Sequence, residues 1–288
     1  MENWKVKTEE TIPELKYGEN NVPYLSYPIL EQTGVVRHGF STREGGVSEG
    51  IFSSMNLSFS RGDNPKAVEE NFRRFARAIC VKPENMVFSK QTHTANVRKV
   101  TEKDKGKGFL KPTDYDDVDG LITNVPGICL VTFYADCVPL FFVDPVKKVI
   151  GLSHSGWRGT VRKIGLETVK KMQKEYQSRP EDILACVGPS ICQDCYEVSK
   201  DVIEEFKTAF SKETWGKLFY EKENKKYQLN LWKANELVFQ EAGILPEHMA
   251  VTNICTQCNK KNLYSHRATN GKRGSLAAFL ALKEENRG

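Results

Sequence analysis

A cysteine and a histidine flank a segment that is predicted to fold back on itself. The apolar runs that follow Cys137 and precede His154 are joined by Asp144-Pro145-Val146-Lys147, and Asp followed by Pro favours a β-turn. If Asp144 pairs with Lys147, Cys137 pairs directly with His154, and side chains paired in this way have Cβ atoms roughly 4.5–5.5 Å apart. A thiol and an imidazole at that separation can share a metal ion or a proton.

The turn leaves the register of this hairpin open. Tight two-residue hairpin loops prefer primed turns, which Pro145 would not adopt, so a longer loop or a bulge is an alternative. A slip of one residue would place Cys137 and His154 on opposite faces of the sheet. The alternative interpretation of the pair is a buried thiol beside a hydrogen-bonded core histidine.

Polar residues adjoin both members of the pair. Asp136 places a carboxylate beside the thiol, and His154-Ser-Gly-Trp-Arg-Gly159 leaves its strand through two glycines into a helix. Such a strand-to-helix turn offers free backbone N–H groups to an anion, and Arg158 adds a positive charge.

Four helices are predicted around these segments. The first follows the cap Asp63-Asn64-Pro65 and has one apolar face. The second follows Gly159, the third covers about residues 202–210, and the fourth begins at Asn230 and ends before Gly243. The apolar face of the first helix consists of Val68, Phe72, Phe75, Ala76 and Ile79.

Short runs rich in Val, Ile, Phe and Leu outnumber the helices and often follow one another directly. We predict strands at Val35–Phe40, Met86–Ser89, Ala95–Val100, Ile128–Phe133, Val138–Val143, Val149–Ser153, Ile183–Val187, Ala250–Ile254 and Leu276–Leu282. This order favours an α/β (α+β) layered fold with mixed β-sheets flanked by helices. Since no linker or repeat interrupts it, we expect an N-terminal extension over 1–34 and a single catalytic domain over 35–288.

Composition and charge exclude several classes of protein. Hydrophobic residues make up 39% and charged residues 27% of the chain, and the net charge is +5, too weak and scattered for a nucleic-acid platform. The most apolar stretch, 128–152, is interrupted by charges and proline, so no membrane span is predicted. No secretory signal is evident at the N-terminus, and we expect a cytoplasmic protein with reduced thiols. Three of those thiols lie in apolar runs and are expected in the core: Cys80, Cys129 and Cys186.

A series of motifs, in order along nearly the whole chain, resembles one known family. The motifs are Arg37-His-Gly-Phe-Ser-Thr-Arg-Glu-Gly-Gly-Val-Ser48, Gln91-Thr-His93, Asp119-Gly-Leu-Ile-Thr123, Ala135-Asp-Cys-Val-Pro139, His154-Ser-Gly-Trp-Arg-Gly159, Gly188-Pro-Ser-Ile191 and Tyr264-Ser-His-Arg267. Together they are similar to the laccase-domain proteins, long labelled multicopper polyphenol oxidases and also known as the YfiH family. Thr94, where many relatives carry Gly, and His266, where Tyr is common, depart from the family pattern.

The resemblance implies a metal site formed by His93, Cys137 and His154. Two imidazoles and one thiolate suit Zn²⁺, and three protein ligands leave the fourth position open, as in catalytic zinc sites. Adventitious copper is a second possible occupant. A multicopper oxidase would also need a cluster of many histidines, whereas this chain has five, so copper-dependent phenol oxidation is the less favoured alternative.

The resemblance also implies phosphorolysis of purine nucleosides (adenosine, inosine and 5′-methylthioadenosine) together with adenosine deaminase activity. In this interpretation His93, Cys137, His154 and Asp136 form the catalytic group, with Asp136 carrying protons. Phosphate and substrate contacts are expected from Arg43, Gly45, Gly46, Arg158 and Arg267. For the segment Thr42–Gly46 the alternative is an ordinary turn. The expected partners are a nucleoside and phosphate, with no nucleic acid and no membrane, and the chain is expected to be a monomer or a homodimer.

Two Cys-x-x-Cys pairs, Cys192/Cys195 and Cys255/Cys258, have metal-ligand spacing. They could form a Cys₄ structural zinc site, although zinc ribbons keep such pairs closer in sequence. Redox-active thiols and plain core or loop residues are the alternatives.

Two other functions compete with the nucleoside enzyme. One is a cysteine hydrolase or amidase, such as an editor of peptidoglycan precursors, in which Cys137 is the nucleophile and His154 its base. Bound zinc discriminates between these two, because a thiolate coordinated to a metal is not free to attack a carbonyl. The other is a non-catalytic protein that senses a ligand in the same pocket.

Overall fold

The computed structural model of the chain describes residues 4–8 and 12–284, which form two six-stranded mixed sheets and a small third sheet. The first sheet has the order β1 (Glu14–Tyr17), β2 (Pro23–Ser26), β3 (Val36–Ser41), β15 (Leu276–Leu282), β7 (Cys129–Tyr134) and β4 (Met86–Phe88). Only its β4–β7 pair is parallel. Strands β1 and β2 extend this sheet beyond β3, so residues before Val35 add to its edge.

The second sheet contains the strands around the Cys/His hairpin. Its order is β14 (Met249–Val251), β10 (Leu184–Val187), β8 (Val138–Asp144), β9 (Val149–Ser155), β6 (Gly120–Thr123) and β5 (Val97–Lys99). The outermost pairs, β10–β14 and β5–β6, are parallel, and the inner pairs are antiparallel. The predicted fold class is confirmed.

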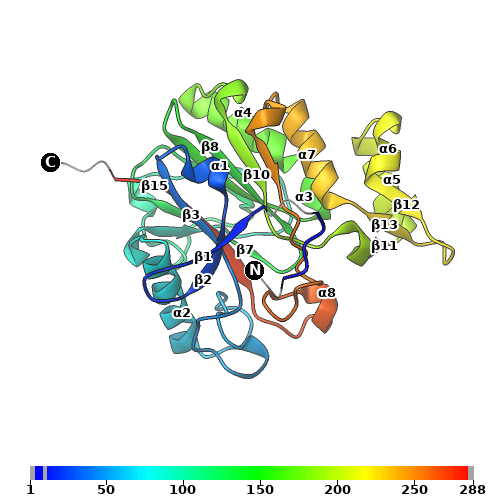
Figure 1. Ribbon diagram of the computed structural model, residues 1–288. Coiled ribbons are helices and arrows are strands. Elements are labelled where there is room, and N and C mark those ends of the chain that lie inside the picture. The colour runs from blue at the N-terminus through cyan, green and yellow to red at the C-terminus, as the bar shows by residue number, and fades with distance from the viewer. Residues whose placement is uncertain (1–3, 9–11, 285–288) are drawn as a thin grey trace.

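The two large sheets pack face to face, and helices cover their outer surfaces (Figure 1). In β15 alternate side chains point to opposite faces of the sheet. Leu276, Ala278 and Leu280 lie between the sheets, while Ala277 and Phe279 pack on the outside against helix α2 (Pro65–Ala78). Burial on both faces explains why the central strands appear in the sequence as continuous apolar runs.

The outer layers are formed by the longer helices. Helix α2 (Pro65–Ala78) covers the first sheet, and α4 (Ile164–Tyr176) and α7 (Leu231–Glu241) cover the second. The short helices are α1 (Pro28–Glu31), α3 (Trp157–Val161), α6 (Trp215–Leu218) and α8 (His266–Thr269). Among the described residues, no helix is long and apolar enough to cross a membrane.

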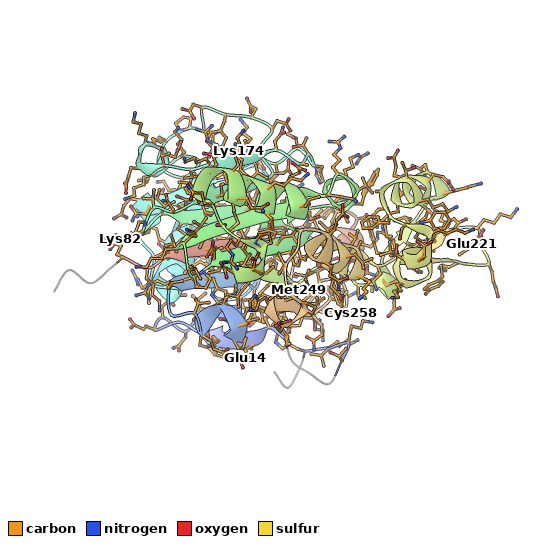
Figure 2. All side chains as sticks on the ribbon, turned by 90° about the horizontal axis from the view of Figure 1, so that it is seen from above. Glu14, Lys82, Lys174, Glu221, Met249 and Cys258 are labelled. Carbon is orange, nitrogen blue, oxygen red and sulfur yellow. The ribbon has the colours of Figure 1, made fainter. Side chains whose placement is uncertain are left out.

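A small lobe projects from the side of the two-sheet body, as Figure 2 shows near the labelled Glu221. It contains α5 (Lys200–Ala209) and a sheet of β11 (Glu197–Val198), β13 (Tyr227–Leu229) and β12 (Phe219–Glu221). Sequence patterns predicted α5 but none of these strands, because each has only two or three residues and lies in a polar context.

The helix predicted after Gly159 is present as α4, but a separate short helix, α3, precedes it. Helix α3 begins earlier, at Trp157, and the chain then breaks at Lys163, whose left-handed backbone (φ 56°) separates α3 from α4. Both helices contact α7 and β9, and in α4 Thr168 Oγ1 is 2.7 Å from Ser153 Oγ of β9.

In the hairpin the direct pairing of Cys137 with His154 is wrong by two residues, and the alternative of a longer loop is confirmed. Asp144 pairs with Val149, not Lys147, and His154 pairs with Pro139. The loop is longer because Pro145 cannot adopt a primed turn; instead Asp144 Oδ1 accepts the N–H groups of Val146 and Lys147, and Lys148 takes a left-handed conformation (φ 52°). A shift of two residues keeps every side chain on its predicted face, so Cys137 and His154 still lie on the same side.

A buried histidine in β3 should make the stability of the fold depend on pH. His38 is 5% exposed, its Nε2 accepts the N–H of Tyr27 at 2.8 Å, and burial lowers its pKa to about 4. Because the pKa is lower in the folded chain than the ordinary value near 6.5, the stabilisation is complete above pH 6.5 and is lost as the pH falls through 4.

We expect this group alone to lower the free energy of unfolding by about 3 kcal/mol between pH 6.5 and pH 4. Urea denaturation of wild type and His38→Gln over this range measures it, since glutamine keeps an acceptor but does not titrate. If the free energy of unfolding fell equally with pH in both proteins, His38 would not be the group that causes the loss of stability.

Candidate active site

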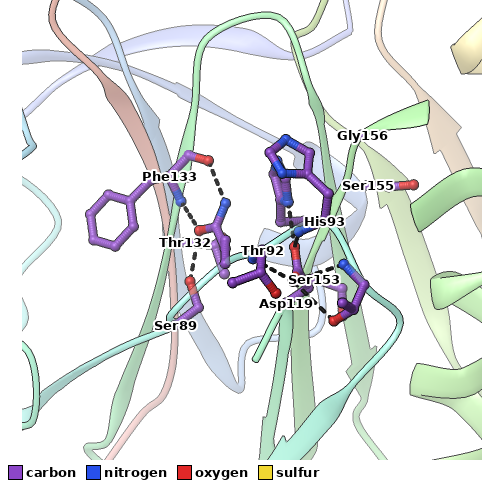
Figure 3. A network of polar contacts seen from close by, with 12 residues as sticks. Ser89, Thr92, His93, Asp119, Thr132, Phe133, Ser153, Ser155 and Gly156 are labelled. Atoms are coloured by element: carbon purple, nitrogen blue, oxygen red, sulfur yellow. Dashed lines mark hydrogen bonds and ion pairs between the residues drawn. The ribbon is translucent and has the colours of Figure 1, made fainter. Parts of the chain in front are cut away.

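Asp119 is the polar centre around which the site is built. It lies just before β6, is fully buried, and its Oδ1 is 2.7 Å from His154 Nδ1. The same carboxylate accepts the backbone N–H groups of Thr92, His93 and Thr94 at 2.9, 3.1 and 3.0 Å. Figure 3 shows Asp119 beneath the turn that carries His93. One side chain therefore orients the imidazole of His154 and holds the backbone of the turn that carries His93.

The turn that carries His93 is also tied to the first sheet. The Gln91 amide donates to the carbonyl of Phe133 at 2.8 Å and accepts the N–H of Phe133 at 2.7 Å, so it pairs with β7 as a backbone would (Figure 3). His93 itself has φ 66°, a left-handed conformation that is costly for a residue other than glycine. Its bond to Asp119 helps to hold this conformation.

These contacts bring His93, Cys137 and His154 together although they come from three separate parts of the chain. One donor atom from each residue lies within 4.8 Å of the others, and the two imidazole rings are 5.0 Å apart, nearly perpendicular. His154 is buried, Cys137 partly exposed and His93 exposed. The cluster therefore lies at the surface end of the second sheet.

The cluster favours charge separation between the thiol and the imidazole. Burial opposes ionisation of Cys137, but His154, and then His93, lower the pKa of the thiol to about 6. Burial likewise opposes protonation of His154, but Cys137 and Asp119 raise its pKa to about 9. At neutral pH Cys137 is therefore a thiolate, the form that binds metals and attacks carbonyl groups.

These donors meet the requirements of a zinc site. Asp119 occupies Nδ1 of His154, which leaves Nε2 for a metal, and a carboxylate behind a ligating histidine is a regular feature of zinc centres. A thiolate and two imidazoles form the donor set of a catalytic site with an open position. The group could therefore hold zinc.

A cavity of about 440 Å³ opens at the cluster, within the usual size range of ligand pockets. Cys137, His154 and His93 line one part of it, and aromatic side chains line another: Phe59, Phe72, Phe88, Phe133 and Tyr134. Its cationic residues are Arg61, Lys90 and Arg273. The site thus combines a nucleophile or metal ligand, a flat apolar wall and positive charge.

The sequence-predicted phosphate contacts occupy other positions. The guanidinium of Arg43 donates to the carbonyls of Ser53 and Lys260 and lies over the ring of Tyr264. Gly46 touches the backbone of residues 54–55 and Gly45 has φ 84°. Arg158 is exposed and lies over the ring of Trp157. Arg267 donates to the carbonyls of Cys195 and Glu197. None of these five residues lines the cavity.

Asp136 adjoins Cys137 but its carboxylate has other partners. Oδ1 accepts the Thr256 hydroxyl at 2.6 Å, and Oδ2 accepts the backbone N–H of Arg267 at 2.7 Å. Its backbone is left-handed, with φ 87°. The residue therefore links the strand carrying Cys137 to two distant loops.

Asp119, Arg61 and Arg273 were not singled out from the sequence. Asp119 begins the motif Asp119–Thr123, but only its distance from His154 reveals its role. Arg273 is 7% exposed and its Nε has no partner among the described residues. Burial, and then the charge of Arg61, lower the pKa of Arg273 to about 10. No sequence pattern links these two arginines.

Gly156 provides the space for the cluster. A Cβ at this position would lie 2.9 Å from His93 Cδ2 and 3.1 Å from Cys137 Sγ, whereas its φ of −72° is open to any residue. We expect Gly156→Ala to weaken zinc binding about 10- to 100-fold, measured by competition with a chromogenic chelator, because the methyl group displaces two donors. Gly216→Ala is the matched control, since a Cβ there meets nothing within 4 Å. Equal affinity in both variants would show that the cluster does not form the metal site.

Fold and site together define a two-sheet α/β protein with a carboxylate-oriented histidine–cysteine centre at the edge of a pocket. The family model described as "Multi-copper polyphenol oxidoreductase laccase" matches residues 37–283. The chain belongs to this family, as the motifs predicted.

Relatives cover most of the chain. It is 38% identical to the purine nucleoside phosphorylase YlmD of Bacillus subtilis over 85% of this chain and 88% of that protein. It is 35% identical to a purine nucleoside phosphorylase of Deinococcus radiodurans over 91% and 93% of the two chains. The crystal structure of YlmD from Geobacillus stearothermophilus superposes with a TM-score of 0.84 at 32% identity, covering 97% and 99%.

The chain has few of the ligands that the copper chemistry in the family's description would require. Among the described residues, only His93 and His154 of the five histidines belong to a group able to hold a metal. A trinuclear copper cluster needs many more imidazoles.

Proposed function

We propose that this chain is a zinc-dependent purine nucleoside phosphorylase. The observation that carries the proposal is the cavity, which brings the His93–Cys137–His154 cluster, an aromatic wall and two arginines into one space. The names of the relatives from Bacillus subtilis and Deinococcus radiodurans support the same reaction. In phosphorolysis the bond from the ribose C1′ to the purine nitrogen breaks, a bond from C1′ to a phosphate oxygen forms, and the base takes up a proton.

The aromatic wall suits a purine ring. Phe59 is 42% exposed, lines the cavity and stacks on the buried Phe72, with ring centroids 5.6 Å apart and planes 16° from parallel. A flat base can stack against the exposed face of Phe59, and such stacking is sequence-tolerant because every base has a π-face. This wall orients the nucleoside without distinguishing adenine from hypoxanthine.

The two arginines suit phosphate. Arg273 is held by bonds from its Nη1 to the Gly274 carbonyl and Ser275 hydroxyl, while its buried Nε has no partner among the described residues. Arg61 and Arg273 both line the cavity, and a bound dianion is attracted by both guanidinium groups. We therefore assign phosphate to the space between Arg61 and Arg273.

Zinc, when bound by His93, Cys137 and His154, would supply a Lewis acid at the open end of the cluster. The chain's own residues position the donors. Asp119 holds His154 in one tautomer, and Gln91 and Asp119 fix the turn that carries His93. These hydrogen bonds keep the donors in a fixed orientation.

Arg61→Ala should raise the KM for phosphate at least about 10-fold with a smaller change in kcat, because it removes a charge from the bound anion. Arg158→Ala is the comparison, since Arg158 was the phosphate residue predicted from the sequence and lies outside the cavity. Initial rates at varied phosphate concentration measure KM and kcat for both variants. A raised KM in Arg158→Ala alone would place phosphate at the N-terminus of α3 instead.

We extend the proposal to adenosine, inosine and 5′-methylthioadenosine as substrates and to deamination of adenosine. Deamination consumes water and releases ammonia, whereas phosphorolysis consumes phosphate. Incubating adenosine with and without phosphate separates them: inosine formed without phosphate shows deamination, and adenine formed only with phosphate shows phosphorolysis. Absence of inosine in both samples would limit the activity to phosphorolysis.

The geometry favours one second candidate function, a cysteine hydrolase. Cys137, His154 and Asp119 form a nucleophile, base and orienting carboxylate, with a thiol pKa of about 6. Iodoacetamide at pH 7 distinguishes a free Cys137 nucleophile from a zinc-bound Cys137, because a free thiolate is alkylated quickly and a zinc-bound one is protected. Rapid alkylation of Cys137 in zinc-replete protein would favour the hydrolase.

A further inference from the structure

A second group of potential metal ligands lies outside the cavity. Cys192 and Cys195 flank a short turn before β11, and Cys255 and Cys258 belong to the loop after β14. The structure brings these pairs together, with all four sulfurs within 4.8 Å of one another. Two are buried and two partly exposed, and they pack against Ile191, Tyr196 and Trp232.

The distances are those of a tetrahedral metal site and not of a disulfide. Zinc–sulfur bonds of about 2.3 Å place the four sulfurs of a tetrahedron about 3.8 Å apart. Cys195 Sγ and Cys258 Sγ are 3.6 Å apart, whereas a disulfide requires about 2.05 Å. All four cysteines are free thiols in this structure.

Hydrogen-bond donors and a cation lie near the sulfurs. Cys255 Sγ accepts two backbone N–H groups, from Cys192 at 3.3 Å and from Cys258 at 3.4 Å. The ammonium of Lys7 donates to Asp194, within the Cys192–Cys195 turn, at 2.8 Å. Hydrogen bonds and a cation near sulfur stabilise the thiolate, the form that coordinates metals.

We propose that a structural zinc ion, separate from the one at the cavity, is bound by Cys192, Cys195, Cys255 and Cys258. Four soft thiolates in tetrahedral arrangement select zinc, and a site with four protein ligands has no open position for a substrate. Its role is therefore to hold the protein together.

The ion would connect segments that are distant in sequence. The Ile191 N–H, beside Cys192, donates to the Asp136 carbonyl at 3.0 Å, and Thr256, beside Cys255, donates to the Asp136 carboxylate. The N-terminal segment joins the same loop, since Lys7 N–H donates to the Asn253 carbonyl. The zinc site thus clamps two loops around the residue that precedes Cys137.

The test uses the full chain carrying Cys137→Ala, so that the cavity site no longer contributes. Purified under reducing conditions and dialysed against EDTA, this protein should retain about one zinc per chain. Exchange with Co²⁺ should give the intense sulfur-to-metal absorption of a tetrathiolate site. Removal of the zinc should lower the Tm by at least about 5 °C, because metal binding stabilises only the folded chain.

Adding Cys258→Ser should abolish the retained zinc, whereas adding Cys80→Ser should leave it, because Cys80 is exposed and outside the cluster. If the Cys258 variant does not fold, the zinc content and cobalt spectrum of Cys137→Ala still test whether the four cysteines bind zinc. A folded, zinc-free Cys137→Ala protein with all remaining thiols titratable would overturn the proposal. Bound iron or a Cys195–Cys258 disulfide in the reduced protein would do so equally.

Discussion

Replacing Cys137 with alanine should abolish phosphate-dependent cleavage of purine nucleosides and remove one zinc ion per chain. Cys137 supplies the anionic ligand of the three donors, and its neighbours His93 and His154 cannot replace it. Loss of a partner behind a ligand usually costs 10- to 100-fold, so loss of the ligand itself should lower kcat/KM by more than about 100-fold. Zinc content by mass spectrometry and ribose 1-phosphate formation measure the two effects.

The fold should survive this substitution. Cys137 precedes β8 and is partly exposed, so a smaller side chain there leaves little cavity. We expect the Tm to stay within a few degrees, and Cys80→Ala, at an exposed thiol far from the cluster, to retain both zinc and activity. Turnover retained in Cys137→Ala would refute the zinc mechanism.

Replacing Asp119 with asparagine should damage both activity and stability. The carboxylate accepts three backbone N–H groups, the Thr94 hydroxyl and His154 Nδ1, and asparagine presents an NH₂ group to some of these donors. We expect a 10- to 100-fold loss of zinc affinity and activity, because His154 loses its orienting partner. Unpaired donors in a buried site should also lower the free energy of unfolding by about 2–4 kcal/mol.

Asp117→Asn is the matched control, because the same change then falls on a half-buried carboxylate of the same loop. Asp117 bonds to Thr92 Oγ1 and Asn96 Nδ2 and has a left-handed backbone that asparagine tolerates. Urea denaturation and zinc titration of both variants should show a large effect only at position 119. Equal effects would mean that Asp119 acts through the loop conformation and not through His154.

The sequence predicted those elements that have a clear periodicity. The apolar face of α2, and the continuous apolar runs of β7, β8, β9 and β15, correspond to local packing rules. The break between α3 and α4 was not predicted, and the length of the hairpin loop was left open, because each loop contains a residue in a left-handed conformation, Lys163 or Lys148, that its residue type does not indicate.

The site was predictable only where motifs marked it. The three donors were identified by resemblance, and the shared face of Cys137 and His154 by strand parity. The orienting partner of His154 was not, because Asp119 comes from another part of the chain, and neither was the meeting of Arg61 and Arg273 at one cavity, because they lie far apart in the sequence. The convergence of the two cysteine pairs likewise depends on how β11 and β14 are placed, which spacing alone does not determine.

Phosphate-dependent turnover of inosine by zinc-quantified wild-type protein tests the central claim most directly. The account predicts hypoxanthine and ribose 1-phosphate in equal amounts, with a rate that rises with phosphate and vanishes when zinc is removed from the cavity site. Inosine left intact by protein that carries zinc at His93, Cys137 and His154 would contradict it.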